Sequence, residues 1–563
     1  MKYISLILLA TIFSFSGFAQ NGKKVQFVGG ARSLITNSNF NAEGDSTTVP
    51  RHSGGNALMD LGFKINPNEN TEILGMVRIN NEFGGFWGGG VTFDVRQLYV
   101  RGVAGGIVRY QIGNINYKLT PYTFYNHNQD ILTSSIGTMQ IKEDVINYES
   151  FYKDNTWRQQ GASANFGLLF PKVIQEIEFN GFITRLNPTN FASVLERLYG
   201  GGNTVIKQSK HLTLGVNHVS VFDLSGTAAD TNLYKNNVSS LTYDVQFKND
   251  NCTFGLDGES GISLTSQSDY PDDDLTDYFV HARIYLNLIK PGLKLNIGYM
   301  DNGPDFRSFG AQSKRVNFNQ ENTFYNRYTN AQVIRPISMY DMYNDPGIYK
   351  DGITVGVMDY NPLINTTLPY GIASFNRQGG YIGVNYADKK KIVEAEGKLY
   401  FLSEIRGQGT SYLKSFLMGD IQTQLHAEKI WSGDKEVTLQ LGMIHQQSTR
   451  NGDFAFQNVD LNSTAVNLGI EGEIVDQLYL MGNVFALCAL GNDQIPSRDS
   501  DDMIINYQGY EVEGSEVNIS GGLRFNFSKK IYLAGMYEWN SYNFSNYDPY
   551  SIQQVSLFYV MKF

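Results

Sequence analysis

Charged side chains recur at alternate positions of stretches whose other positions are apolar. Asp60, Lys64, Glu72 and Arg78 all fall between apolar neighbours in this way. Because the side chains of a strand point alternately to its two faces, these four would share one face and leave the other face apolar. Charges that line a closed wall select among dissolved ions and solutes by their sign. The spacing therefore predicts the chemistry of a water-filled passage.

The same alternation assigns many more charges to the polar face. The basic candidates are Lys64, Arg78, Arg109, Arg283, Lys294, Lys398 and Arg524. The acidic candidates are Asp60, Glu72, Glu176, Glu178, Asp244, Asp257, Glu259, Glu394, Glu396, Glu471, Glu473 and Glu538. Because the acidic set is the longer one, we expect a lining that favours cations and neutral solutes over phosphate-like anions. The alternative for any single residue is an ordinary ion pair with a neighbouring strand.

Residues that carry out catalysis or bind metals do not form a known motif. The sequence has no HExxH, no Cys/His cluster at zinc spacing, no GxSxG and no GxxxxGK[ST]. His281 falls on the polar face near Glu259 and Arg283, where it either transfers protons or forms part of a polar wall. The acidic runs at 269–277 and 499–502 lack the spacing of an EF-hand loop, so we interpret them as solvated loop charge. We therefore expect no enzyme activity, no cofactor and no metal site.

Strands joined in hairpins must position these charges. The clearest example has apolar residues at alternate positions of 517–527, a turn at 528–530 and a second apolar series over 531–539. Near Arg96 and Gln97 the apolar positions change parity, which predicts a β-bulge. Longer connections rich in Gly, Asn, Asp and Ser separate consecutive tight turns. The tight turns are expected near residues 66–70, 103–106, 169–172, 208–211, 248–251, 288–292, 388–391, 431–435, 475–477 and 528–530.

Short turns at one end of the strands and long loops at the other are typical of transmembrane β-barrels. The turns give about 22 strands, within a range of about 16 to 22. Charged residues make up 18% of the chain, which is below the roughly 25% of soluble domains. We predict an all-β fold: an antiparallel up-and-down β-barrel in the outer membrane, with short periplasmic turns, long extracellular loops and no N-terminal plug domain. A soluble β-sandwich or propeller is the alternative, but it should carry more surface charge.

Both ends of the sequence agree with this location. An apolar run follows a positively charged start, and Gly17-Phe18-Ala19 has small residues at the positions that a signal peptidase recognises. The last strand alternates apolar residues and ends on Phe563, an ending that resembles the closing strand of outer-membrane barrels. We expect a signal peptide at residues 1–19 and a single barrel domain at residues 20–563.

Two connections are much longer than the others. Because long loops without secondary structure are uncommon unless they are functional, the segment 301–376 either folds inward and constricts the passage or forms a lid or docking surface outside it. The aromatic segment 117–160 would hold a partner or cover the passage. The candidate constriction residues of the first segment are Arg307, Lys314, Arg315, Arg327 and Arg335.

One hairpin carries a series of residues found together in a known group of proteins. The strand Asp94-Val-Arg96-Gln97-Leu-Tyr99-Val100 is followed by Ile112-Gly113-Asn114 and then by Lys118-Leu-Thr-Pro121-Tyr122. This series resembles a hairpin of phosphate-selective-type porins, although it departs from their pattern at Leu98 and Asn114. The signal ending and the abundance of Asn, Tyr and Lys are similar to those of outer-membrane proteins of the Bacteroidota. The resemblance implies a porin-like barrel, whereas the acidic lining argues against phosphate selectivity.

Taken together, these features favour a passive diffusion channel for small polar solutes that leans mildly toward cations. One alternative is a non-enzymatic subunit of an outer-membrane secretion or protein-assembly complex, whose long loops bind other envelope proteins. A further alternative is a surface adhesin. Outer-membrane lipid is the expected surrounding, and the net charge of −10 excludes a general nucleic-acid binder.

Overall fold

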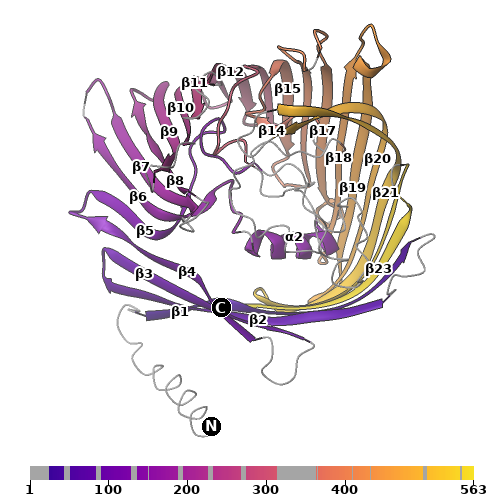
Figure 1. Cartoon of the computed structure of the whole chain (residues 1–563). Helices are drawn as coiled ribbons and strands as arrows, with labels where there is room; N and C mark the ends of the chain where they lie inside the picture. Colours follow the sequence, from indigo (N-terminus) through magenta and orange to yellow (C-terminus); the bar gives the residue numbers. More distant parts are fainter. Residues whose placement is uncertain are drawn as a thin grey trace.

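The protein is a closed barrel of 22 antiparallel strands in a computed structural model (Figure 1). Segments from two of the long connections lie inside the barrel. The structure describes residues 25–42, 51–83, 91–127, 136–149, 151–170, 172–187, 195–225, 233–267, 274–313, 363, 366–408, 410–431, 433–498, 504–545 and 548–563.

The strands follow one another along the chain with few interruptions. The first half contains β1 (Val25–Ala42), β2 (Arg51–Asn68), β3 (Thr71–Glu82), β4 (Val91–Ala104), β5 (Val108–Tyr117), α2 (Gly137–Glu149), β6 (Trp157–Leu169), β7 (Glu176–Asn187), β8 (Glu196–Lys207), β9 (Leu212–Leu224), β10 (Tyr234–Lys248), β11 (Cys252–Gln267), β12 (Leu275–Leu288) and β13 (Leu293–Asn302). The second half contains β14 (Pro369–Ile372), β15 (Arg377–Ala387), β16 (Val393–Ser403), β17 (Ser415–His426), α5 (Glu428–Trp431), β18 (Val437–Arg450), the 3-10 turn η4 (Ala455–Gln457), β19 (Val459–Val475), β20 (Leu478–Arg498), β21 (Ile504–Ser528), β22 (Ile531–Phe544) and β23 (Tyr550–Lys562).

The barrel closes between its first and last strands. β1 pairs with β2 on one side and with β23 on the other, where Gly30 lies opposite Lys562 and Ala42 lies opposite Tyr550. No strand of the 22-stranded wall therefore has a free edge, and the backbone groups of the wall are satisfied within it. The short strand β14 is not one of the 22 strands of this wall.

The predicted number of 22 strands and the predicted tight turns are confirmed. Each of those turns falls between two consecutive strands, and the long connections lie at the other end. The predicted bulge is also present. On β4, Gln97 pairs with Met76 and Val95 pairs with Val77, so Arg96 has no partner on β3.

The outer face of the wall is apolar. Exposed side chains on this face include Phe63, Val77, Ile284, Phe401 and Leu468. A closed barrel with such a surface meets the two requirements for crossing a bilayer, an apolar exterior and a backbone without unpaired groups. The architecture is that of an outer-membrane β-barrel. Among the described residues, no helix is long and apolar enough to cross a membrane.

The inner face differs from the uniformly polar lining that alternation alone predicts. Toward the loop end of the strands, inward positions carry buried aromatic side chains, among them Phe182, Tyr199 and Phe279. These rings pack against segments that enter the barrel from the long connections. The inner wall is apolar where it holds those segments and polar where water reaches it.

Candidate functional site

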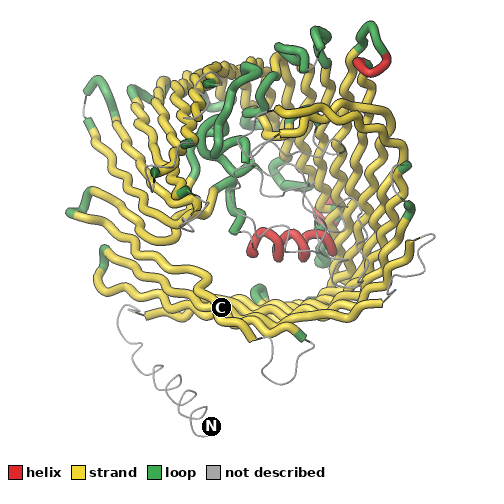
Figure 2. Tube along the Cα trace, viewed as in Figure 1, coloured by secondary structure: helices red, strands yellow, loops and turns green. Residues whose placement is uncertain are grey.

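The connection between β5 and β6 folds into the barrel. Its helix α2 lies in the interior of the barrel, as Figure 1 and Figure 2 show. The helix packs against β19, β20 and β21. The sequence predicts that this segment holds a partner or covers the passage; the structure places its described part within the barrel.

The spacing of residues along α2 gives the helix two different sides. Met139, Lys142 and Ile146 are buried and recur at the intervals that place side chains on one face of a helix. Gln140 and Asp144 are exposed on another face, although they lie inside the barrel. Water therefore reaches one side of α2, while its other side is fixed to the wall.

Polar contacts fix the first half of α2. The Thr138 hydroxyl lies 3.0 Å from Oδ1 of Asn483 and 2.5 Å from the hydroxyl of Ser520. One turn later, Nζ of Lys142 forms an ion pair with Glu538, and both side chains are 2% exposed. Such a buried pair is costly to separate, because one unpaired charge would then remain in a poorly hydrated site.

The last residue of α2 enters a group of guanidinium side chains on the barrel wall. Arg32 Nη2 lies 2.6 Å from Oε1 of Glu149, and Arg78 Nη1 lies 2.5 Å from Oε2. Arg96 Nη1 lies 3.4 Å from Oε2. We call Arg32, Arg78 and Arg96 the arginine cradle. Arg96 also donates to the main-chain oxygen of Tyr148 at 2.6 Å, which satisfies a carbonyl at the helix end.

A second carboxylate, that of Asp60, pairs with two of the three cradle arginines. Arg78 donates to its two oxygens through Nε and Nη2, both at 2.8 Å, and Arg96 Nε lies 2.9 Å away. The Tyr148 hydroxyl also donates to Asp60. The Asp60 side chain has no exposed surface. The bulge at Arg96 explains how β4 contributes, because an unpaired extra residue redirects its side chain.

Electrostatics explain why Glu149 stays ionised. Burial opposes its charge, but the hydrogen bond from Arg78 and the charges of Arg32, Arg78 and Arg96 outweigh burial and lower the pKa of Glu149 from 4.5 to about 2. The Glu149 carboxylate is therefore charged throughout the neutral pH range.

The segment that precedes α2 is fixed to the opposite part of the wall. Thr120 Oγ1 donates to Oε1 of Glu259 at 2.7 Å, and Ser240 donates to the same oxygen at 2.5 Å. The Tyr122 ring stacks on Phe279 with 4.1 Å between ring centroids. Residues 118–127 therefore bridge from the wall to the interior of the barrel.

Parts of the segment 301–376 also lie inside. Phe306 and Phe309 are buried, and the Ser308 hydroxyl donates to the carbonyl of Tyr122 at 2.7 Å. Arg307 donates to the carbonyls of Pro304 and Phe306, and its guanidinium lies 4.8 Å from the Phe375 ring centroid. The predicted constriction residues Lys314, Arg315, Arg327 and Arg335 lie outside the described residues, so their role stays a prediction.

Three of the predicted lining residues hold the inserted segment instead of facing open water. Arg78 belongs to the cradle, Glu259 fastens Thr120, and Glu538 pairs with Lys142. The sequence identified these charges as inward-facing but not their partners, because the partners lie in a connection far away along the chain.

Several other predicted lining residues form local pairs. Arg283 lies 2.6 Å from Asp257 on the adjacent strand, Lys398 lies 2.5 Å from Glu396, and Arg524 lies 2.5 Å from Glu471. His281 Nε2 hydrogen bonds with the Tyr381 hydroxyl at 2.9 Å. The remaining positions are near the tight turns and include Arg109, Glu176, Glu178, Lys294, Glu394 and Glu473.

The alternating pattern does not point to five residues that build the site: Arg32, Arg96, Lys142, Tyr148 and Glu149. A signal for the last three was present. The run from Gly137 to Glu149 has helical rather than alternating apolar spacing, which sets it apart from every strand.

A part of the inner wall away from α2 is open and polar. A cavity of about 280 Å³ lies at the turn ends of β13, β15, β16 and β17. Its polar lining is Lys294, Asn385, Glu394, Glu396, Gln422 and Gln424. Amide groups both donate and accept hydrogen bonds, so this surface can contact solutes of either kind.

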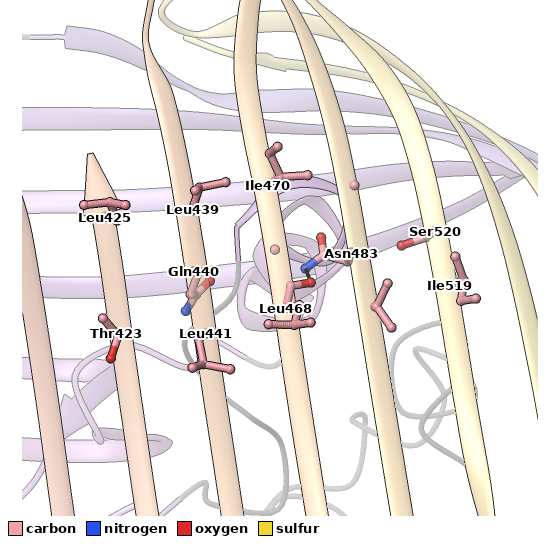
Figure 3. Close-up of a pocket in the computed structure, with 13 residues that line it drawn as sticks. Thr423, Leu425, Leu439, Gln440, Leu441, Leu468, Ile470, Asn483, Ile519 and Ser520 are labelled. Atoms are coloured by element: carbon pink, nitrogen blue, oxygen red, sulfur yellow. Dashed lines mark hydrogen bonds between the residues drawn. The ribbon is translucent and has the colours of Figure 1, made fainter. Parts of the chain in front are cut away.

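The larger hollow of the wall, about 510 Å³, belongs to the lipid-facing side (Figure 3). Leu439, Leu468, Ile470 and Ile519 line it together with Gly482, which contributes no side chain. The neighbouring inward side chains of these strands include those that hold Thr138 of α2. This hollow is part of the apolar exterior.

Comparisons with known proteins do not assign the chain to a family. No family model and no curated protein matches it. Among solved structures it is similar to OccK10 from Pseudomonas aeruginosa, with a TM-score of 0.40, 9% identity and coverage of 83% of this chain and 99% of that chain. It is similar to a BenF-like porin from Pseudomonas fluorescens, with a TM-score of 0.34, 8% identity and coverage of 96% and 99%. It is also similar to the FrpB iron transporter from Neisseria meningitidis, with a TM-score of 0.45, 10% identity and coverage of 95% and 82%. The architecture of this chain is defined by its own strand pairing.

Proposed function

We propose that this chain is an outer-membrane channel for small polar solutes and that α2 narrows its passage. The observation that carries this proposal is the position of α2, which lies inside a closed barrel yet exposes Gln140 and Asp144. Ion pairs and hydrogen bonds hold the helix to the wall, and its apolar residues Met139, Ile141 and Ile146 pack against wall side chains. Because α2 is not one of the wall strands, its departure from this position would widen the passage without opening the wall.

The finer part of the proposal is a mild preference for cations. Inward positions of β16, β17 and β19 carry Glu394, Glu396, Asp420, Glu471 and Glu473, and the basic residue among them is Lys398. Carboxylates on the wall of a wide passage attract cations and exclude anions from its centre. Local pairing reduces this effect but does not reverse its sign.

Single-channel recording in planar bilayers tests the proposal. Replacement of residues 137–149 by a Gly/Ser linker of equal length should increase the conductance severalfold, because it removes the obstruction without breaking the wall. Replacement of Ala455–Gln457, in the connection between β18 and β19, is the matched control and should leave conductance unchanged. Absence of conductance from the folded linker variant would reject the channel and favour a subunit of a secretion or assembly complex.

A further inference from the structure

The arginine cradle contains more positive charge than its carboxylates neutralise. Arg32, Arg78 and Arg96 face Glu149 and Asp60, so three guanidinium groups share two carboxylates. Arg158 adds a fourth guanidinium beside them, since it donates to the main-chain oxygen of Arg96. The site therefore favours anions, and its guanidinium groups outnumber the carboxylates that they bind.

Unused hydrogen-bond donors support this count. Arg32 Nε and Arg158 Nη1 are buried and have no hydrogen-bond partner among the described residues. A buried donor without an acceptor is unfavourable, and a guanidinium group can bind a carboxylate through two donors at once. A further or larger anion would satisfy groups that Glu149 leaves unpaired.

The two carboxylates differ in how easily they can be replaced. Asp60 is fully buried in the wall between β2 and β3; its oxygens accept hydrogen bonds from Arg78 and Tyr148, and it forms an ion pair with Arg96. Glu149 is 12% exposed and stands at the end of α2, a helix that is not part of the wall. A cavity of about 60 Å³ lies beside the helix; its lining includes Arg32, Tyr148 and Lys562, together with the Asp144 carboxylate and apolar side chains such as Val560. Glu149 is therefore the carboxylate that can leave, and space for a replacement lies next to it.

We propose that the arginine cradle is a binding site for a solute carboxylate, and that Glu149 occupies it until such a solute displaces Glu149 and weakens the attachment of α2 to the wall. This inference rests on the proposed channel and names its substrate class as small organic acids. Withdrawal of Glu149 alone would leave several buried guanidinium groups with a single carboxylate, which is unfavourable. A solute carboxylate removes that penalty, so its binding shifts α2 toward the released state.

The anion requirement does not contradict a cation-leaning wall. The cradle lies on β1, β3 and β4, whereas the carboxylate-rich positions are on β16, β17 and β19. A solute carboxylate would bind at the cradle on β1, β3 and β4, and cations would accompany it along β16, β17 and β19.

Planar-bilayer recording with succinate as the probe tests this inference on the full chain at pH 7 and constant ionic strength. Succinate should raise the open fraction severalfold, and its uncharged diamide should not. Arg32→Gln should raise the half-effective succinate concentration about tenfold, the equivalent of about 1.4 kcal/mol of binding free energy. Glu149→Gln should give a high open fraction before succinate is added. A wild-type channel that conducts but ignores succinate, or responds equally to the diamide, would overturn the inference and leave the proposed channel intact.

A reversible tether supplies the matched control. Because the hydroxyls of Thr138 and Ser520 are 2.5 Å apart, Thr138→Cys with Ser520→Cys should join α2 to the wall, in a background that carries Cys252→Ser and Cys488→Ser. The tethered channel should ignore succinate until a reductant is added. An unchanged response in the tethered form would reject release of α2 as the cause.

A spin label provides a readout that does not depend on conductance. A label at the exposed residue 140, introduced by Gln140→Cys in a background free of the two native cysteines, should become more mobile when succinate is added. Unchanged mobility under saturating succinate would also reject the inference. Failure of conductance in every folded variant, including the one without α2, would instead reject the proposed channel.

Discussion

Two parts of the barrel wall, β1–β4 (the first wall) and β16–β19 (the second wall), enclose the same interior but differ in how exposed their charged side chains are. Arg32 and Arg96 on the first wall have side chains that are only 10% and 7% exposed, because α2 covers them. Glu394 and Glu396 on the second wall are 38% and 46% exposed and pair with nearby lysines. On these two walls, the buried charges hold an inserted helix, whereas the exposed charges pair with side chains of the wall and its turns.

The largest effect should come from breaking the buried pair between Lys142 and Glu538. Glu538→Gln leaves the Lys142 ammonium without its charged partner, which should destabilise the packed position of α2 by about 3 to 5 kcal/mol. Conductance should rise as the helix detaches. The double variant with Lys142→Met removes both charges and should recover most of the wild-type conductance. Equal behaviour of the single and double variants would show that the pair does not hold the helix.

Acidification should weaken the anchor on the first wall. The pKa of Glu149 is lowered to about 2, so its contribution is complete above the ordinary value of 4.5 and is lost as the pH falls toward 2. Channel opening by wild type should increase across this interval. Glu149→Gln should not show this increase in opening at low pH, whereas Asp144→Asn, on the exposed side of the same helix, should still show it. A wild-type profile that Glu149→Gln does not change would contradict the anchoring role.

A smaller effect is expected from neutralising the second wall. Glu394→Gln with Glu396→Gln removes two exposed carboxylates, so the reversal potential under a salt gradient should move toward anions by a few millivolts. Conductance should change little, because α2 is untouched. The matched substitution Glu69→Gln lies in the tight turn after β2 and should have no such effect. A shift toward cations would contradict the proposed preference.

The smallest effect should come from a single hydrogen bond of the inserted segment. Thr120→Val removes the donor to Glu259 but leaves Ser240 as a second donor, so the cost should be about 1 kcal/mol. Amide hydrogen exchange of residues 118–127 should become faster, while exchange in β10 and β11 stays unchanged. Faster exchange throughout those strands would show instead that Glu259 mainly stabilises the wall.

The alternating pattern predicted the wall well and the inserted structure poorly. It located the tight turns, the bulge near Arg96 and the inward position of Arg78, Glu259 and Glu538. It did not locate α2, because a test based on a period of two residues treats a helix as a loop. The partners were equally hidden, since Glu149 is 71 residues from Arg78 and 117 residues from Arg32.

The sequence by itself determined which residues form strands and which faces of those strands are apolar. Both properties follow from local periodicity and from the need to hide the backbone in lipid. The tertiary structure alone decided which charges meet. Closure of the barrel brings β1, β3 and β4 around the end of α2, and three guanidinium groups then converge on a single carboxylate. Such convergence depends on long-range geometry, which no local pattern of residues encodes.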